Sequence, residues 1–209
     1  MIKIKICGIT NPEDALMAVK AGADALGFVF FRGSPRYISP EQAAAIIHQL
    51  PPFVQTVGLF VNEELVTVNS TADQCGLDLV QLHGEESPDY CAAVKRRVIK
   101  AFRVKDASSL DEIINYRVAA CLLDAWSPAA HGGTGVTFNW EIAARAAAAH
   151  CIILAGGLNP ENVAGAIAAV EPYAVDVSSG VESAPGKKDA ELVNGFIRAT
   201  RSLHHEISG

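Results

Sequence analysis

Residues 151–178 read CIILAGGLNPENVAGAIAAVEPYAVDVS, two short apolar runs with a helical pattern between them. The runs Cys151–Ala155 and Ala174–Ser178 are typical of buried strands. Pro160–Val170 is expected to be a helix, because Asn159 is a capping residue type and proline is favoured at the first helical position. A strand, a helix and a second strand in this order predict parallel strands joined by a right-handed crossover.

The same alternation runs through the whole chain. We expect strands at Ile2–Cys7, Asp24–Phe30, Val54–Val61, Asp78–His83, Val98–Val104, Ala119–Asp124, Cys151–Ala155 and Ala174–Ser178. Helices are expected at Pro12–Ala21, from Ser39 onward, at Glu63–Gln74, from Ser87 onward, and at Ser108–Tyr116, Asn139–His150, Pro160–Val170 and Asp189–Arg201. Eight such units of about 26 residues predict the α/β class and a single-domain (β/α)8 TIM barrel over residues 1–209. An open doubly wound sheet is the alternative, and it usually has about five or six strands.

The composition excludes several classes of protein. Half of the 209 residues are hydrophobic and 19% are charged, which is too apolar for a disordered chain. The net charge of −6 argues against nucleic acid as a partner, because phosphate backbones attract basic surfaces. Charged residues interrupt every apolar stretch before ~20 residues, and Met1–Ile6 alternates instead of forming a signal peptide. We therefore expect a soluble cytoplasmic protein with no membrane partner.

The spacing of the cysteines does not indicate a disulfide framework. They are odd in number, widely spaced and without a Cys-x-x-Cys pair, at Cys7, Cys75, Cys91, Cys121 and Cys151. This pattern disfavours both disulfides and a structural zinc site. Most of these residues are expected to be small buried hydrophobes, and no metal site is predicted.

Two strand ends predict a phosphate site. In a (β/α)8 barrel the functional residues lie at the carboxyl ends of the strands. Gly156 and Gly157 follow the seventh strand, and Ser178, Ser179 and Gly180 follow the eighth. Glycine lets backbone amides approach a ligand, and these loops form the usual phosphate pocket of this fold, so we predict a phosphorylated small-molecule substrate. The alternative is that the glycines only shape tight turns. Neither loop contains a P-loop or a complete dinucleotide fingerprint, and no cofactor is predicted.

Strand parity predicts that Cys7 points into the barrel. Lys3, Lys5 and Cys7 share one face of the first strand, and the isoleucines between them share the face expected to pack under the helices. Residues two apart in a strand lie roughly 6.5–7 Å from each other, so Lys5 can bring positive charge near the thiol. That charge would favour the thiolate and make Cys7 a usable base or nucleophile. The alternative is that the lysines lie in water at the amino end of the strand, which is the interpretation we prefer for Lys3.

Asp124 ends the sixth strand on the same face as Leu122. In a mostly apolar mouth a carboxyl group can stay partly protonated and serve as an acid. Helix capping or a salt bridge is the structural alternative. The loop Trp126–Gly135 that follows is long and glycine-rich, as lid loops often are, and His131 is interpreted as an exposed histidine of that lid.

Seven motifs occur together in a distinctive order and spacing. They are Lys5–Thr10, Ser34–Tyr37, Gln81–Gly84, Leu123–Asp124, Gly132–Gly135 with Phe138–Trp140, Ala155–Leu158 and Asp176–Glu182. Over essentially its whole length the chain resembles the phosphoribosylanthranilate isomerases, a family of tryptophan biosynthesis. One departure is Asn139, where the family often has Asp; this position starts a helix and lies outside the chemistry.

The resemblance implies an Amadori rearrangement of N-(5-phosphoribosyl)anthranilate to the 1-deoxyribulose phosphate product. Asp124 would be the general acid that protonates the furanose ring oxygen, and Cys7 the general base that removes the proton from sugar C2. Arg36 carries a guanidinium fork suited to the anthranilate carboxylate. Further expected substrate contacts, to sugar hydroxyls or ordered water, are Gln81, His83 and Asp176.

Two other functions stay open. One is another sugar-phosphate barrel: a pentose-phosphate epimerase wants inward His and Asp metal ligands, and an aminoimidazole carboxamide ribotide isomerase wants a carboxylate at the position of Cys7. The second is a non-catalytic barrel that binds a phosphorylated ligand, which needs neither Cys7 nor Asp124. The sequence also leaves open whether the protein is a monomer or a homodimer.

Overall fold

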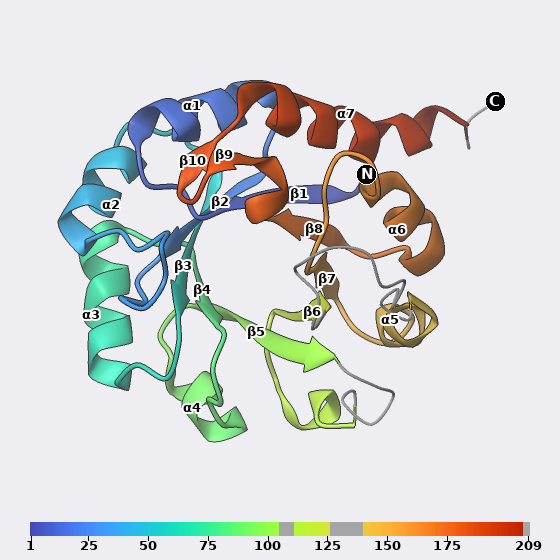
Figure 1. Ribbon diagram of the computed structural model, residues 1–209. Helices are drawn as coiled ribbons and strands as arrows, with labels where there is room; N and C mark the ends of the chain where they lie inside the picture. Colours follow the sequence, from blue (N-terminus) through green and yellow to red (C-terminus); the bar gives the residue numbers. More distant parts are fainter. Residues whose placement is uncertain (105–110, 126–139, 207–209) are drawn as a thin grey trace.

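A computed structural model describes residues 1–104, 111–125 and 140–206, and its parallel strands form a closed barrel in the order β1 to β8 (Figure 1). The strands are β1 (Lys3–Cys7), β2 (Ala25–Val29), β3 (Gln55–Phe60), β4 (Leu79–Leu82), β5 (Arg97–Val104), β6 (Ala120–Ala125), β7 (Ile152–Ala155) and β8 (Ala174–Val177). Lys5 in β1 pairs with Ala25 of β2 on one side and with Asp176 of β8 on the other. This closure confirms the predicted (β/α)8 barrel and excludes the open doubly wound sheet.

Helices surround the barrel (Figure 1). They are α1 (Pro12–Ala21), α2 (Pro40–Ile47), α3 (Leu65–Cys75), α4 (Pro88–Ala93), α5 (Trp140–Ala147), α6 (Val163–Val170) and α7 (Ala190–Glu206). The N-termini of α1 and α2 show how the sequence determines where a helix begins. Asn11 accepts a hydrogen bond from the backbone of Asp14 ahead of Pro12, and Ser39 forms a reciprocal capping box with Gln42. These caps satisfy backbone donors that the first helical turn leaves unpaired.

The alternation in β1 separates two apolar layers. Ile4 and Ile6 are fully buried in the cluster that includes the inward residues of the helices. Leu122, Ile99 and other strand residues form a second, smaller cluster that fills the barrel. The predicted parity is confirmed: the isoleucines pack under the helices, and the Lys5–Cys7 face points inward.

Two predicted helices differ from the structure, and one hairpin was not predicted. The helix expected at Ser108–Tyr116 appears, within the described residues, as the 3-10 helix η2 (Ile113–Asn115). Helix α6 begins at Val163, because the Asn159 side chain accepts the backbone N–H groups of residues 161 and 162 and holds a turn there. Sequence patterning also missed a two-stranded hairpin of β9 (Glu182–Ala184) and β10 (Lys187–Lys188), whose strands are too short to show alternation.

None of the helices within the described ranges is long and apolar enough to cross a membrane.

Helix α7 supplies a test of the outer layer. Phe196 is fully buried where α7 packs against α1 and α6, whereas Leu192 on the same helix is 38% exposed. We expect Phe196→Ala to lower the free energy of unfolding by about 3–5 kcal/mol, because it leaves a cavity in a packed core. Leu192→Ala is the matched control and should cost less than about 1 kcal/mol. Urea unfolding followed by circular dichroism measures both; equal losses would contradict this packing.

Candidate active site

One cavity of about 500 Å³ lies at the carboxyl ends of the strands. All of the predicted site residues line it: Cys7, Arg36, Gln81, His83, Asp124, Gly156, Gly157, Asp176, Ser178, Ser179 and Gly180. They come from strands or strand ends distributed around the barrel, so only the closed fold brings them together. The chemical roles assigned to them remain predictions.

Cys7 ends β1 and is buried beside a buried ion pair. Lys5 Nζ lies 2.9 Å from Asp176 Oδ1, and their side chains are only 4% and 9% exposed. Gly27 is the register partner of Cys7 in β2, and a Cβ at Gly27 would lie 2.7 Å from the Cys7 sulfur. The absence of a side chain at Gly27 therefore provides the space that the thiol occupies.

The electrostatics of Cys7 differ from the sequence prediction. Burial raises the pKa of the Cys7 thiol, and the attraction of Lys5, which acts in the opposite direction, is smaller. Burial also opposes the charge on Lys5, but attraction to Asp176 and Cys7 holds the pKa of Lys5 above its ordinary value. The predicted effect of Lys5 is present, yet the predicted net shift toward thiolate was wrong because desolvation is larger.

Asp124 is the end of a polar chain across the cavity. His83 Nε2 lies 3.2 Å from Asp124 Oδ2, and Gln81 Nε2 lies 3.2 Å from His83 Nδ1. The Gln81 amide nitrogen can only donate, which fits the His83 tautomer that accepts at Nδ1 and donates from Nε2 to Asp124. This arrangement orients the Asp124 carboxyl group. Sugar contacts predicted for Gln81 and His83 remain predictions.

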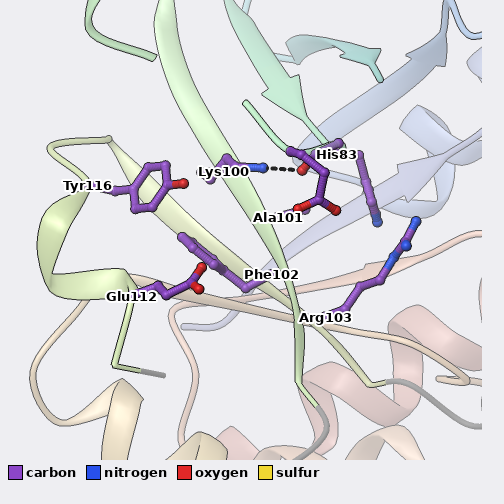
Figure 2. A pocket seen from close by; sticks show the side chains of 9 residues that line it. His83, Lys100, Ala101, Phe102, Arg103, Glu112 and Tyr116 are labelled. Carbon is purple, nitrogen blue, oxygen red and sulfur yellow. Dashed lines mark hydrogen bonds between the residues drawn. The ribbon is translucent and has the colours of Figure 1, made fainter. Parts of the chain in front are cut away.

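A second hollow, of about 380 Å³, adjoins His83 and Arg103 (Figure 2). At its wall Lys100 Nζ donates to the Gly84 carbonyl oxygen at 2.6 Å and to Glu86 Oε2 at 3.0 Å. Burial opposes the charge on Glu86, but backbone donors and Lys100 hold its pKa below the ordinary value. These contacts fix the loop that follows β4, and therefore the position of His83.

Arg36 lines the cavity but is already engaged with a carboxylate. Its Nε and Nη2 atoms donate to Glu182 at 2.8 and 2.6 Å. The sequence analysis did not assign a role to Glu182, which lies on the unpredicted hairpin. Arg103 was also missed: it lies near the end of β5 and lines the cavity, and the strand-end rule would have found it.

The two predicted phosphate loops lie against each other. Gly156 and Gly157 have φ values of 82° and 68°, a left-handed conformation that favours glycine. A Cβ at Gly180 would collide with the Leu158 carbonyl oxygen, so only glycine permits this approach. The Ser178 hydroxyl is buried and has no hydrogen-bond partner among the described residues.

Two predictions concern the lid and the metal. The loop Trp126–Gly135, with His131, lies outside the described residues. Within residues 1–104, 111–125 and 140–206, no group of three or more His, Cys, Asp or Glu side chains is placed to hold a metal ion.

The family model described as N-(5'phosphoribosyl)anthranilate (PRA) isomerase matches residues 4–199. The chain belongs to the N-(5'-phosphoribosyl)anthranilate isomerase family. A relative of that name from Pelobacter propionicus is 68% identical over 206 residues, which is 99% of both chains. Another from Geobacter sulfurreducens is 68% identical over 201 residues, which is 96% of this chain and 99% of the relative. The resemblance predicted from the motifs is confirmed.

Solved structures of family members share the fold. Phosphoribosyl anthranilate isomerase from Thermotoga maritima has a TM-score of 0.91 and 48% identity, and the alignment covers 97% of this chain and 100% of the other. A structure in complex with reduced 1-(o-carboxyphenylamino)-1-deoxyribulose 5-phosphate has a TM-score of 0.88 and 47% identity, with the same coverage.

The surroundings of Cys7 predict opposite effects of two substitutions on its titration. The pH at which alkylation of Cys7 by iodoacetamide is half-maximal should lie above the ordinary thiol pKa of about 8.5. Lys5→Met removes a cation that lowers the Cys7 pKa and should move this midpoint upward. Asp176→Asn removes an anion that raises it and should move the midpoint downward. Mass spectrometry of the Cys7 peptide measures the rates, with thermal unfolding as the folding control; one shared midpoint would contradict this electrostatic account.

Proposed function

We propose that this chain converts N-(5'-phosphoribosyl)anthranilate into 1-(2-carboxyphenylamino)-1-deoxyribulose 5-phosphate, with Asp124 as the general acid and Cys7 as the general base. As a family member it is an isomerase, an enzyme of tryptophan biosynthesis. The observation that carries the mechanism is that Cys7 and Asp124 line one cavity from β1 and β6. Going around the barrel from β6 to β1, the two intervening strands are β7 and β8, and each leads into one of the two glycine-containing loops.

Ring opening is the first step. Asp124 gives its proton to the furanose ring oxygen, and the bond between that oxygen and C1 breaks. The lone pair of the anilino nitrogen forms a double bond to C1, so the product is an open-chain iminium. The hydrogen bond from His83 Nε2 then stabilises the carboxylate that remains on Asp124.

Proton removal from C2 is the second step. Cys7, in its thiolate form, accepts the proton, and the electron pair of the C–H bond forms the C1–C2 double bond as the nitrogen becomes neutral. The resulting enolamine takes a proton from water at C1 and releases the proton of its C2 hydroxyl to water, which gives the ketone. Proton exchange with water restores Cys7 and Asp124. Substrate and product contain the same atoms, so the rearrangement consumes no co-reactant. The raised pKa of Cys7 makes its thiolate a strong base for this transfer.

The two ends of the substrate have separate binding groups. We assign the phosphate to Gly156, Gly157 and Ser178–Gly180, supported by the Ser178 hydroxyl, which has no hydrogen-bond partner within the described part of the chain. We assign the anthranilate carboxylate to Arg36, and the sugar hydroxyls to Gln81, His83 and Asp176. The substrate then spans the mouth of the barrel, with its reacting carbons between Cys7 and Asp124.

The proposal includes the setting of the reaction. We propose a cytoplasmic enzyme that needs no cofactor or metal, binds neither nucleic acid nor membranes, and works as a monomer or a homodimer. In support of these two assembly states, monomeric forms of the dimeric isomerase from Thermotoga maritima are among the similar solved structures.

The first test of the base is Cys7→Ser. The wild-type protein should consume N-(5'-phosphoribosyl)anthranilate, and the loss of the fluorescence of this substrate measures the rate. Cys7→Ser should lower kcat by roughly 10²-fold or more, because a hydroxyl is a far poorer base than a thiolate. Cys151→Ser, at an exposed cysteine, is the matched control and should keep the wild-type rate. No turnover by the wild type would reject the function, and a near-native rate for Cys7→Ser would reject the base.

The test of the acid is Asp124→Asn. This substitution keeps the size of the side chain but removes its acidic proton, so we expect kcat to fall roughly 10²-fold or more with little change in KM. Asp73→Asn, at a side chain that is 53% exposed, serves as the control. A variant with nearly full kcat would mean that another group opens the ring.

A further inference from the structure

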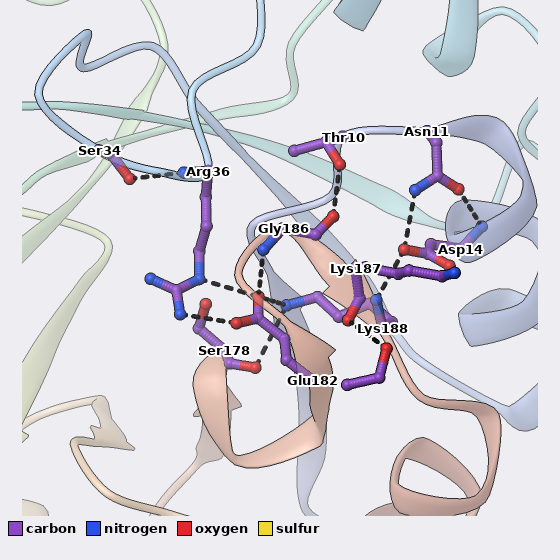
Figure 3. Close-up of polar contacts among 11 residues, drawn as sticks. Thr10, Asn11, Asp14, Ser34, Arg36, Ser178, Glu182, Gly186, Lys187 and Lys188 are labelled. Carbon is purple, nitrogen blue, oxygen red and sulfur yellow. Dashed lines mark hydrogen bonds and ion pairs between the residues drawn. The ribbon is translucent and has the colours of Figure 1, made fainter.

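Three charged side chains form a cluster beside the cavity: Arg36, Glu182 and Lys188 (Figure 3). Glu182 lies between the two cations. Its Oε1 accepts from Arg36 Nε at 2.8 Å and from Lys188 Nζ at 2.8 Å, while its Oε2 accepts from Arg36 Nη2 at 2.6 Å. Neither Glu182 nor Lys188 lines the cavity, so neither is placed to touch a substrate.

Glu182 is charged although it is buried. Its side chain is 4% exposed, and burial alone would raise its pKa. The hydrogen bonds and charges of Arg36 and Lys188 outweigh burial and hold the pKa below its ordinary value. In return, the Glu182 hydrogen bond raises the pKa of Arg36. The two hydrogen bonds make the pair a bidentate carboxylate–guanidinium contact, which adds geometric specificity to the attraction of the charges.

The contact leaves a defined part of Arg36 for a ligand. A guanidinium has five N–H groups, and Glu182 occupies the one on Nε and one on Nη2. The outer edge, formed by Nη1 and Nη2, keeps the geometry that binds a second carboxylate through two hydrogen bonds. The stem of Arg36 is fixed as well, because it passes over Gly8, where a Cβ would lie 2.6 Å from Arg36 Cδ.

The hairpin that carries Glu182 and Lys188 is anchored to the first βα loop and to the start of α1. The Lys188 backbone N–H donates to Asp14 Oδ2 at 2.8 Å, and the Thr10 hydroxyl donates to the Gly186 carbonyl oxygen. The Lys188 side chain is fully buried, and its Nζ also donates to the Ser178 carbonyl oxygen at 3.2 Å. Lys188, which donates to Glu182, is therefore itself fixed by contacts with Asp14 and Ser178.

We propose that Glu182, fixed by Lys188, is a positioning residue that aims the outer edge of Arg36 at the ring carboxylate of the substrate. It thereby makes the enzyme selective for substrates that carry this carboxylate. The inference rests on the proposed function, since it needs Arg36 to bind that group.

The direction in which one substitution changes KM distinguishes a positioning role of Glu182 from a purely electrostatic one. Glu182→Gln keeps the size of the side chain but removes a negative charge, so the cluster becomes more positive. If Arg36 acted only through charge, KM for the anionic substrate would fall. Positioning predicts the reverse: KM should rise roughly tenfold or more, because a charged hydrogen-bonded contact is lost, while kcat changes less than about threefold.

The experiment compares two substrates. N-(5'-phosphoribosyl)anthranilate and N-(5'-phosphoribosyl)aniline differ only in the ring carboxylate, so the effect of Glu182→Gln on KM should disappear with the aniline compound. In an Arg36→Met background, Glu182→Gln should add no further loss. Glu64→Gln is the matched control, because Glu64 is exposed and makes no capping hydrogen bond through its side chain.

The outcomes are distinct. Thermal unfolding checks that each variant folds. Glu182→Asp keeps the charge but is one methylene shorter, so it should give a KM between those of the wild type and Glu182→Gln. This variant tests the proposal if Glu182→Gln does not fold. An unchanged or lower KM for the carboxylate substrate, or equal losses for both substrates, would overturn the positioning role. Failure of the wild type to convert N-(5'-phosphoribosyl)anthranilate would instead reject the proposed function.

Discussion

The buried ion pair between Lys5 and Asp176 lies on the seam where the first and last strands of the barrel meet. The two residues are register partners in β1 and β8, and both are nearly inaccessible to solvent. A charge buried this deeply needs a partner, because an isolated one carries a large desolvation cost. The register that joins them also places Cys7 two residues further along β1, at the cavity. One contact therefore links the two strands that close the barrel to the electrostatic surroundings of the thiol.

Three of the proposed functional side chains have a polar neighbour that acts on them. Lys5 acts on Cys7, His83 contacts Asp124, and Glu182 holds Arg36. Such support limits the rotamers that the reacting groups can adopt, so little reorganisation is needed when a substrate arrives. The barrel provides the strand ends, but the supporting residues determine where the functional groups point.

The fold and much of the candidate site could be predicted, because they depend on local information. Periodicity and helix caps identified the strand–helix units, and the two-residue repeat of β1 placed Cys7 inside the barrel. The pKa of Cys7 could not be predicted, because its direction depends on burial, which exists only after folding. The link between Arg36 and Glu182 was equally inaccessible: the residues are 146 positions apart, and the hairpin that brings them together has no recognisable alternation.

The anchors of that hairpin affect how the protein is made. The hydrogen bonds from Thr10 to Gly186 and from Lys188 to Asp14 join residues 176 and 174 positions apart. On a ribosome, Arg36 and Cys7 emerge long before their partners, and domains complete such distant contacts only after most of the chain is available. A nascent chain that ends before residue 182 contains the thiol and the arginine but not the carboxylate that orients the arginine. The isomerase site is thus assembled late in synthesis, so shortened translation products would retain Cys7 and Arg36 without a complete site.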